Sequence, residues 1–336
     1  MLKTAENVSF GHPDKVCDQI SDAILDECLR QDPYSRVAVE ALGGHGKLSI
    51  MGEVTTTAKF DAAAIARQIY REIGYQDDLE ILVNITKQSS DIARGVDVGG
   101  AGDQGIMVGY ACDQTDELLP LEHVLATKLI RKLEEVRLAK QSKLANYLLP
   151  DSKAQVTLED NDVDTVVISS QHNPEIDFAE FQKLVEEEII KPIISRAKNI
   201  YVNPAGPFIQ GGFAADTGLT GRKITADNYG PQIPVGGGAF SGKDATKVDR
   251  SAAYMARYLA TEYLKKFKAK EVVVKLAYAI GRAEPVMATA SVDGEDIAID
   301  GYDLSPAGII KKLNLVKPQF RDRARFGFFL DFDVEN

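Results

Sequence analysis

The sequence has few cysteines, no long apolar run and no surplus of positive charge. Its three cysteines, Cys17, Cys28 and Cys112, lie far apart and form no C-x-x-C spacing. Neither a zinc knuckle nor a disulfide framework is therefore indicated, and we expect buried free thiols. No apolar segment approaches the roughly 20 residues needed to cross a bilayer, and the first residues lack the apolar core of a secretory signal. We therefore expect a cytoplasmic protein with no membrane partner.

Basic residues are fewer than acidic ones. The 336 residues include 39 Lys and Arg against 50 Asp and Glu, a formal net charge of −11. Because an acidic surface repels phosphate groups, no nucleic-acid partner is expected. An anionic ligand would need cations or metal ions concentrated in one cleft. With 44% apolar and 26% charged residues, the composition is that of a folded globular protein.

Apolar periodicity divides the chain into three blocks with the same order of helix, strand, strand, helix and strand. The first block has helices at 14–31 and 61–73 and strands near 35–42, 47–56 and 80–87. The second has helices at 120–141 and 177–195 and strands near 154–159, 163–170 and 199–203. The third has helices at 249–267 and 306–314, strands near 271–279 and 286–292, and FGFFL at 326–330 as its last strand. The sequence predicts an α+β fold with a pseudo-threefold repeat of three similar domains, each a helix-covered sheet, over 1–100, 101–211 and 212–336.

Two long, glycine-rich polar stretches, 88–105 and 203–248, are predicted to hold the active site. GAGDQG at 100–105 fits the dinucleotide pattern G-x-G-x-x-G, but it has no strand before it and no helix after it. Residues 237–243 fit G-x-x-x-x-G-K, but Asp244 replaces the Ser or Thr of a Walker loop and the preceding NYGPQIPV is not a core strand. Glycine N–H groups with Lys243 and Lys247 nevertheless suit a polyphosphate.

Several charged residues could carry chemistry, although each has a structural alternative. His12 and Asp14 flank Pro13 at a predicted helix start, where His12 could cap the helix or contact phosphate and Asp14 could favour the dipole or bind magnesium. Glu40 and Glu53 lie in predicted strands and could face either the core or solvent. The remaining candidates, taken singly, are ordinary turn, helix-start or surface charges: Lys153, Asp216, Arg222, Lys223 and Asp249. Alternation of acids and bases inside glycine-rich loops favours a common site.

Four segments, GHPDK, GAGDQG, LTGRK and GGGAFSGKDATKVDRSAAY, together resemble S-adenosylmethionine synthetase, also called methionine adenosyltransferase. Supporting stretches in the same order include VCDQISDAILD, GEVTTT, KQSSDI and YAIGRAEP, so the resemblance covers nearly the whole chain. It implies three related α+β domains and a transferase that forms S-adenosylmethionine from ATP and L-methionine. In this family the methionine sulfur attacks C5′ of ATP, and the displaced triphosphate is hydrolysed to pyrophosphate and phosphate.

The resemblance also implies roles for individual residues. Catalysis falls to His12, Lys153, Arg222 and Lys243. The implied ATP contacts are His12, Asp151, Ser152, Lys153, Phe208, Asp216, Arg222, Lys223, Ala239 and Lys243, with Phe208 stacking on adenine. The implied methionine contacts are Glu53, Gln88, Asp103, Asp216 and Lys247. Two Mg²⁺ per site would use Asp14 and Asp249, and K⁺ would use Glu40. The family builds its sites between two subunits, so a homodimer is expected and a monomer should be inactive.

The sequence departs from the family pattern at several positions. Pro207 replaces the Arg that usually precedes the adenine-stacking Phe, which removes a cation and a backbone donor. Ser152 stands where Ala is common, and Val235 where His usually precedes the glycine-rich segment. The 88–105 loop, which resembles the family's gate over the site, is several residues shorter than in typical bacterial members, so turnover is expected to differ. The chain also ends early, which leaves open whether dimers pair into a tetramer.

Two other functions compete with this interpretation. A kinase or NTPase that uses the 237–243 loop predicts ADP as the product. A catalytically idle homologue that binds nucleotide for regulation predicts no turnover. The presence of His12, Asp14, Lys153, Lys243 and Asp249 argues against the idle homologue, because binding alone has no need of groups that serve a leaving triphosphate.

Overall fold

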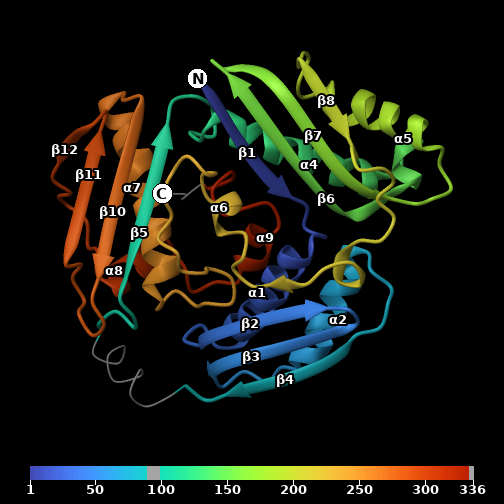
Figure 1. Ribbon diagram of the computed structural model, residues 1–336. Coiled ribbons are helices and arrows are strands. Elements are labelled where there is room, and N and C mark those ends of the chain that lie inside the picture. The colour runs from blue at the N-terminus through green and yellow to red at the C-terminus, as the bar shows by residue number, and fades with distance from the viewer. Residues whose placement is uncertain (89–98, 333–336) are drawn as a thin grey trace.

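The computed structural model describes residues 1–88 and 99–332, which form three four-stranded sheets around a central region (Figure 1). The first sheet has the order β4-β3-β2-β9, with β2 (Arg36–Gly44), β3 (Lys47–Thr55), β4 (Glu80–Thr86) and β9 (Gly218–Leu219). The second has the order β1-β6-β7-β8, with β1 (Leu2–Val8), β6 (Leu148–Glu159), β7 (Asp162–His172) and β8 (Asn199–Val202). The third has the order β12-β11-β10-β5, with β5 (Gly105–Cys112), β10 (Glu271–Tyr278), β11 (Met287–Val292) and β12 (Glu295–Ile297).

The helices follow the predicted repeat. Each block begins with one long helix, and these are α1 (Pro13–Gln31), α4 (Leu121–Ala139) and α7 (Val248–Phe267). The second helix of each block is α2 (Ala62–Ile73), α5 (Phe178–Val185) with a π-helical continuation at Glu186–Ile190, or α8 (Pro306–Lys312). Short helices α6 (Ile224–Asp227) and α9 (Phe320–Ala324) and single 3₁₀ turns at Leu144–Asn146 and Gly212–Ala214 complete the described elements. The long helices pack on their own sheets, α1 on β2, α4 on β6 and α7 on β10, so the predicted α+β fold of three similar domains is confirmed.

Each sheet borrows one strand from another part of the chain, which the periodicity did not predict. The amino-terminal β1 pairs antiparallel with β6, so that Ala5 lies opposite Val156. Likewise β5 precedes the second block but pairs with β10 of the third, and β9 follows the second block but pairs with β2 of the first. The borrowed strands cover sheet edges that would otherwise present unpaired N–H and C=O groups. No sheet is therefore built from one continuous segment.

The prediction that FGFFL at 326–330 is a strand is wrong. These residues form an irregular turn after α9, and Gly327 has φ +95, which interrupts extended backbone. Phe328 and Phe329 are buried instead against Phe240 and Tyr254, with ring centroids 4.9 Å apart for Phe240 and Phe328 and 5.9 Å for Tyr254 and Phe329. The segment is apolar because its rings fill the core, and β12 takes the edge position in the third sheet.

Helix α1 is the most buried long segment of the first block, because every side chain from Pro13 to Asp26 is buried. It lies next to β2 and faces the connections of the last third of the chain in the centre of Figure 1. The expectation for the cysteines is confirmed, since Cys17, Cys28 and Cys112 are all buried and free. Burial raises the pKa of Cys28 to about 12. Among the described residues, no helix is both long and apolar enough to span a membrane.

Candidate active site

His12 stands at the amino-terminal end of α1. As predicted, Pro13 occupies the first helical turn, and His12 is the residue that caps it, because His12 Nδ1 accepts a hydrogen bond of 3.1 Å from the Asp14 N–H. Burial, together with the charges of Lys223 and Lys153, lowers the pKa of His12 to about 3. The imidazole is therefore neutral near pH 7, and with Nδ1 accepting, its proton resides on Nε2. His12 can cap the helix and donate to a ligand oxygen at the same time.

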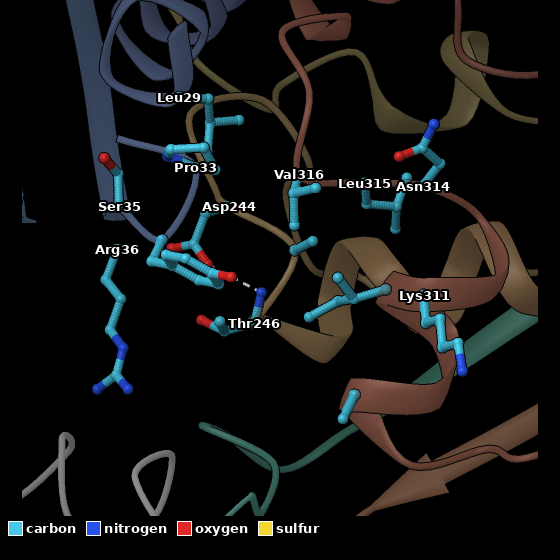
Figure 2. Close-up of a pocket in the computed structure, with 14 residues that line it drawn as sticks. Leu29, Pro33, Ser35, Arg36, Asp244, Thr246, Lys311, Asn314, Leu315 and Val316 are labelled. Atoms are coloured by element: carbon cyan, nitrogen blue, oxygen red, sulfur yellow. Dashed lines mark hydrogen bonds between the residues drawn. The ribbon is translucent and has the colours of Figure 1, made fainter. Parts of the chain in front are cut away.

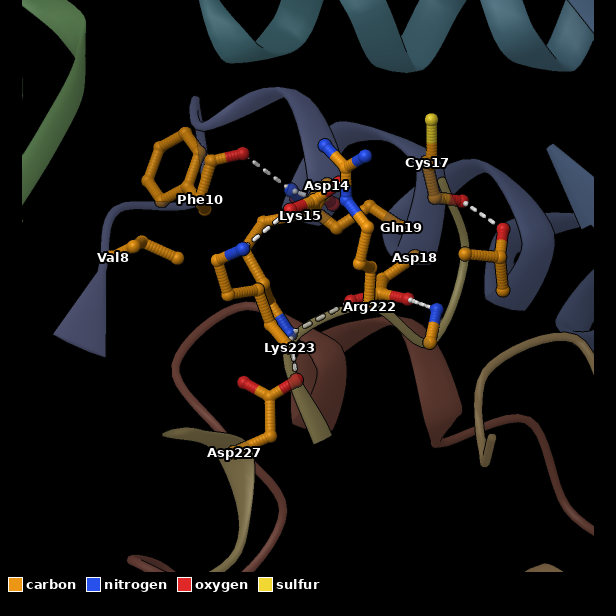
Figure 3. Close-up of polar contacts among 12 residues, drawn as sticks. Val8, Phe10, Asp14, Lys15, Cys17, Asp18, Gln19, Arg222, Lys223 and Asp227 are labelled. Carbon is orange, nitrogen blue, oxygen red and sulfur yellow. Dashed lines mark hydrogen bonds and ion pairs between the residues drawn. The ribbon is translucent and has the colours of Figure 1, made fainter. Parts of the chain in front are cut away.

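Asp14 is fully buried and joins α1 to the segment 219–223. Its carboxylate lies 2.8 Å from Arg222 Nε and 2.5 Å from Lys223 Nζ (Figure 3). It also accepts a 2.9 Å hydrogen bond from the Leu219 N–H. Burial opposes ionisation, but the hydrogen bonds from Lys223 and Leu219 outweigh it and lower the pKa of Asp14. Asp14 is thus an anion that gathers two cations beside His12.

The second sheet contributes the remaining members of this first cluster. Asp151, on β6, accepts a 2.9 Å hydrogen bond from the Gly212 N–H, and burial raises its pKa to about 6. Lys153, two residues further along β6, is exposed, and its charge acts on both His12 and Asp151. Asp216 is also exposed, and its charge acts on the same two groups. Ser9 holds the backbone of Ser152, because Ser9 Oγ accepts a 2.9 Å hydrogen bond from the Ser152 N–H.

A second cluster forms where the 243–249 segment meets the first sheet. Lys243 Nζ lies 2.5 Å from Asp249 Oδ2 at the start of α7. Lys243 also bridges to Ala38 of β2, and a cavity of about 230 Å³ beside it is lined by Glu40 and Glu53. Glu40 is exposed and Glu53 half-buried, so strand alternation places both on the outer face of the sheet. Within the part of the chain that the structure describes, no ion pair joins this cluster to the first.

The other predicted residues lie outside these ion pairs. Lys247 is held 2.5 Å from the buried carboxylate of Asp244. Asp103 is exposed in the turn before β5, where its carboxylate accepts from the Gln104 N–H. The remaining three are half-buried: Gln88, Phe208 and Ala239.

Ala239 borders the first cluster, because a Cβ at Gly221 would lie 2.3 Å from the Ala239 Cβ. The Phe208 carbonyl accepts a 2.9 Å hydrogen bond from the His172 N–H, which ties it to the end of β7. Most of the predicted gate at 88–105 falls on 89–98, outside the described residues.

Sequence reasoning missed a row of buried aspartates on α1. Asp18 accepts from the Gly221 N–H and Asp22 from the Gly242 N–H, both at 2.8 Å. Asp26 accepts from the N–H groups of residues 319–321. With Asp14, these residues recur every four positions, which places them along one helical face. The spacing was a readable signal, but repeated acids on a helix usually mark a solvated face.

Lys15 was also passed over, although it belongs to GHPDK. It is fully buried, with Nζ 2.8 Å from Asp227 and 3.1 Å from Asp18 (Figure 3). Burial disfavours its charge, but Asp227 and Asp18 outweigh burial and raise its pKa. Lys15 therefore holds α6 against α1.

A larger cavity of about 540 Å³ lies between the end of α1 and the α8 region (Figure 2). Its lining includes Leu29, Ile310 and Val316, and none of the predicted site residues. The two charged clusters, rather than this mainly apolar cavity, mark the candidate site, because an anionic ligand needs cations. Across residues 1–88 and 99–332, no three His, Cys, Asp or Glu side chains gather into a metal site within one chain.

Comparison with protein-family models accounts for almost the full length of the chain. Residues 1–93 match the model of the S-adenosylmethionine synthetase N-terminal domain. Residues 98–208 match the central domain of the same family, and residues 210–335 match its C-terminal domain. The three matches follow one another in order, and each covers one block of the repeat. The chain therefore belongs to the S-adenosylmethionine synthetase family, the methionine adenosyltransferases, whose activity is the formation of S-adenosylmethionine from ATP and methionine.

Proposed function

We propose that this protein catalyses in-line attack of the methionine sulfur on C5′ of ATP, followed by hydrolysis of the displaced triphosphate to pyrophosphate and phosphate. One observation carries the proposal, which is that the chain holds cations beside two aspartates, with Arg222 and Lys223 around Asp14 and Lys243 beside Asp249. A thioether has no proton to lose, so the first step needs no general base. The barrier falls instead through alignment and stabilisation of charge on the leaving triphosphate.

The first cluster is suited to the triphosphate. His12 is neutral and presents an Nε2–H, which can donate to a phosphate oxygen near the breaking bond without repelling the neighbouring cations. Arg222 and Lys223 are held by Asp14, and Lys153 projects from the exposed face of β6. Lys243 would complete the set from the second cluster. Loss of one preorganised donor to a developing oxyanion typically costs about 10²–10³ in rate.

Asp14 and Asp249 would hold the two magnesium ions, and Glu40 would hold potassium, since hard cations prefer carboxylate oxygens. Magnesium, when bound, neutralises charge on the leaving triphosphate. The surroundings of Asp249 fit this role, because a Cβ at Gly238 would lie 2.5 Å from its Oδ1 and one at Gly105 would lie 3.2 Å away. Neither glycine places a side chain against that oxygen.

The remaining site residues divide between the two substrates. Acidic and amide groups suit the ammonium of methionine, and this set is Glu53, Gln88, Asp103 and Asp216, with Lys247 nearby. The nucleoside would meet Phe208, which stacks on adenine, and the group Asp151, Ser152, Asp216 and Ala239.

The same surfaces support a homodimer with sites between its subunits. The outer face of the first sheet carries Glu40 and Glu53, and it also exposes Leu42 (48%), Met51 (46%) and Leu82 (56%). Apolar side chains gathered around charged groups on one sheet face are typical of an interface. A partner covering this face would bring the second cluster of one chain to the first cluster of the other.

The test is to incubate the protein with ATP, methionine, magnesium and potassium and to separate the products by chromatography with mass spectrometry. We expect S-adenosylmethionine, pyrophosphate and phosphate in equal amounts, and none of them without methionine. Lys243→Met should lower the rate by about 10²-fold or more, whereas the exposed control Lys191→Met should not. ADP as the product, or no S-adenosylmethionine at saturating substrates, refutes the proposal. Repeating the assay with GTP, CTP and UTP measures the effect of Pro207 on base selectivity.

A further inference from the structure

Asp22 and Arg250 form a buried ion pair between α1 and the first turn of α7. Neither side chain has any exposed surface. The two carboxylate oxygens lie 2.6 and 2.8 Å from the two terminal guanidinium nitrogens. Arg250 is held further by the Tyr254 hydroxyl, which accepts from Nε at 3.0 Å, and by the Phe320 ring, whose centroid is 4.2 Å from the guanidinium carbon. The guanidinium thus has one orientation, fixed from three sides.

The same pair holds the backbone from which Lys243 projects. Asp22 Oδ1 accepts a 2.8 Å hydrogen bond from the Gly242 N–H, and Arg250 donates a 3.1 Å hydrogen bond to the Lys243 carbonyl. On the other side, the Gly242 carbonyl accepts from the Val39 N–H at 3.1 Å. The backbone of residues 242 and 243 is therefore tied to both α1 and β2.

Arg250 also directly follows Asp249 in the chain. Neighbouring residues on an α-helix point about 100° apart, so the first turn of α7 buries Arg250 and turns Asp249 toward Lys243. Lys243 Nζ and Asp249 Oδ2 meet at 2.5 Å. One buried ion pair therefore fixes the backbone positions from which Lys243 and Asp249 project.

We propose that Asp22 and Arg250 are positioning residues, which set the backbone of Lys243 and Asp249 and touch no substrate themselves. The inference rests on the proposed function, since it is the triphosphate and its metal ion that the cluster would meet. A buried ion pair is weak support for stability, because well-packed apolar residues often serve as well. The pair does fix the orientation of the groups that it bonds. A displacement of about 1 Å in a catalytic group can cost about 10²-fold in rate.

Asp22→Asn is the test variant, and Asp26→Asn is its matched control. Asp26 lies one helical turn further along α1 and is also buried. It accepts hydrogen bonds of 2.9, 3.1 and 2.9 Å from the N–H groups of Gln319, Phe320 and Arg321, which lie at the start of α9 and outside the site. Asp22→Asn should lower kcat for S-adenosylmethionine formation about 100-fold with a smaller change in the KM for methionine. It should also weaken binding of inorganic tripolyphosphate measured by titration calorimetry. Asp26→Asn should lower the melting temperature and leave kcat unchanged.

Equal losses of kcat in the two folded variants, or no loss in Asp22→Asn, would overturn the proposal. If Asp22→Asn does not fold, the double variant Asp22→Leu with Arg250→Met replaces the pair by apolar groups, which restores packing without the hydrogen bonds to residues 242 and 243. A folded double variant with low kcat supports positioning, one with wild-type kcat overturns it, and failure of both variants to fold assigns the pair to stability alone. Wild-type protein that forms no S-adenosylmethionine refutes the proposed function instead, and tripolyphosphate binding then remains the readout for positioning.

Discussion

Replacing Lys15 by Met removes the only cation of the buried group formed with Asp18 and Asp227. The side chains of these three residues are 0%, 2% and 2% exposed, so water cannot replace the lost charge. Met is similar in length to Lys and fills irregular space well. The change is therefore mainly electrostatic, because two carboxylates are left close together without their partner.

The expected loss of stability depends on pH. Removing one partner of a buried pair costs about 3–5 kcal/mol. Burial raises the pKa of Asp227 to about 6 and also raises that of Asp18, even with Lys15 in place, and both rise further without it. A carboxyl whose pKa is raised by folding binds more protons in the folded than in the unfolded state, so its contribution to stability is lost as the pH rises through the folded pKa. Each additional unit of pKa adds about 1.4 kcal/mol to the cost at high pH.

Urea unfolding followed by circular dichroism, at about pH 5 and about pH 8, measures this effect. Lys191→Met is the control, because Lys191 and Glu186 form a 3.0 Å pair whose side chains are 54% and 39% exposed. Its cost should stay below about 1 kcal/mol. Adding Asp18→Asn and Asp227→Asn to Lys15→Met should recover much of the stability. A Lys15→Met protein as stable as the wild type at the higher pH, or destabilised equally at both, would refute the reasoning.

Three further predictions follow from single residues. Gly242 has φ +79, and a Cβ there would lie 1.9 Å from the Val39 carbonyl oxygen. Gly242→Ala should therefore lower the unfolding free energy by more than about 3 kcal/mol. The control Gly237→Ala, where φ is +89 and the space is open, should lower it by about 1 kcal/mol. Equal melting temperatures for the two variants would contradict this. His12→Asn should lower kcat by about 10²-fold, by the same factor at about pH 6 and about pH 8, because the His12 pKa of about 3 leaves the imidazole neutral at both; a pH-dependent ratio in the synthesis assay would count against it. Burial raises the pKa of Asp151 to about 6. The unfolding free energy of the wild-type protein, relative to that of Asp151→Asn, should therefore fall as the pH rises through 6, by up to about 3 kcal/mol between about pH 4 and about pH 7. Urea unfolding of both proteins across that pH range measures this change, and a difference in unfolding free energy that does not vary with pH would contradict the prediction.

Local pattern was enough to predict most of the elements. The helices that begin near His12, Asp61 and Lys247 were predicted to within one residue of their observed starts, because apolar spacing and start signals such as Pro13 lie within the segment itself. The strand predicted at 326–330, the fifth element of the third block, was wrong because the local pattern there does not specify the structure. Apolar residues at 326–330 indicate burial, but they do not say whether burial comes from a strand or from rings packed in an irregular turn.

The sequence by itself determined the three-block repeat, the family, and the set of charged residues from which a triphosphate site could be built. The tertiary structure alone decided how those residues are grouped. It placed Asp14 beside Lys223 and Asp249 beside Lys243, and it buried Asp22 against Arg250. It also decided that β1, β5 and β9 join sheets of other blocks. The physical reason is that periodicity records how a residue relates to neighbours a few positions away. The pairs of Asp14 with Lys223 and of Asp22 with Arg250 join residues more than 200 positions apart, and the exchanged strands pair with partners more than 100 positions away. Their meeting depends on how whole sheets and helices pack.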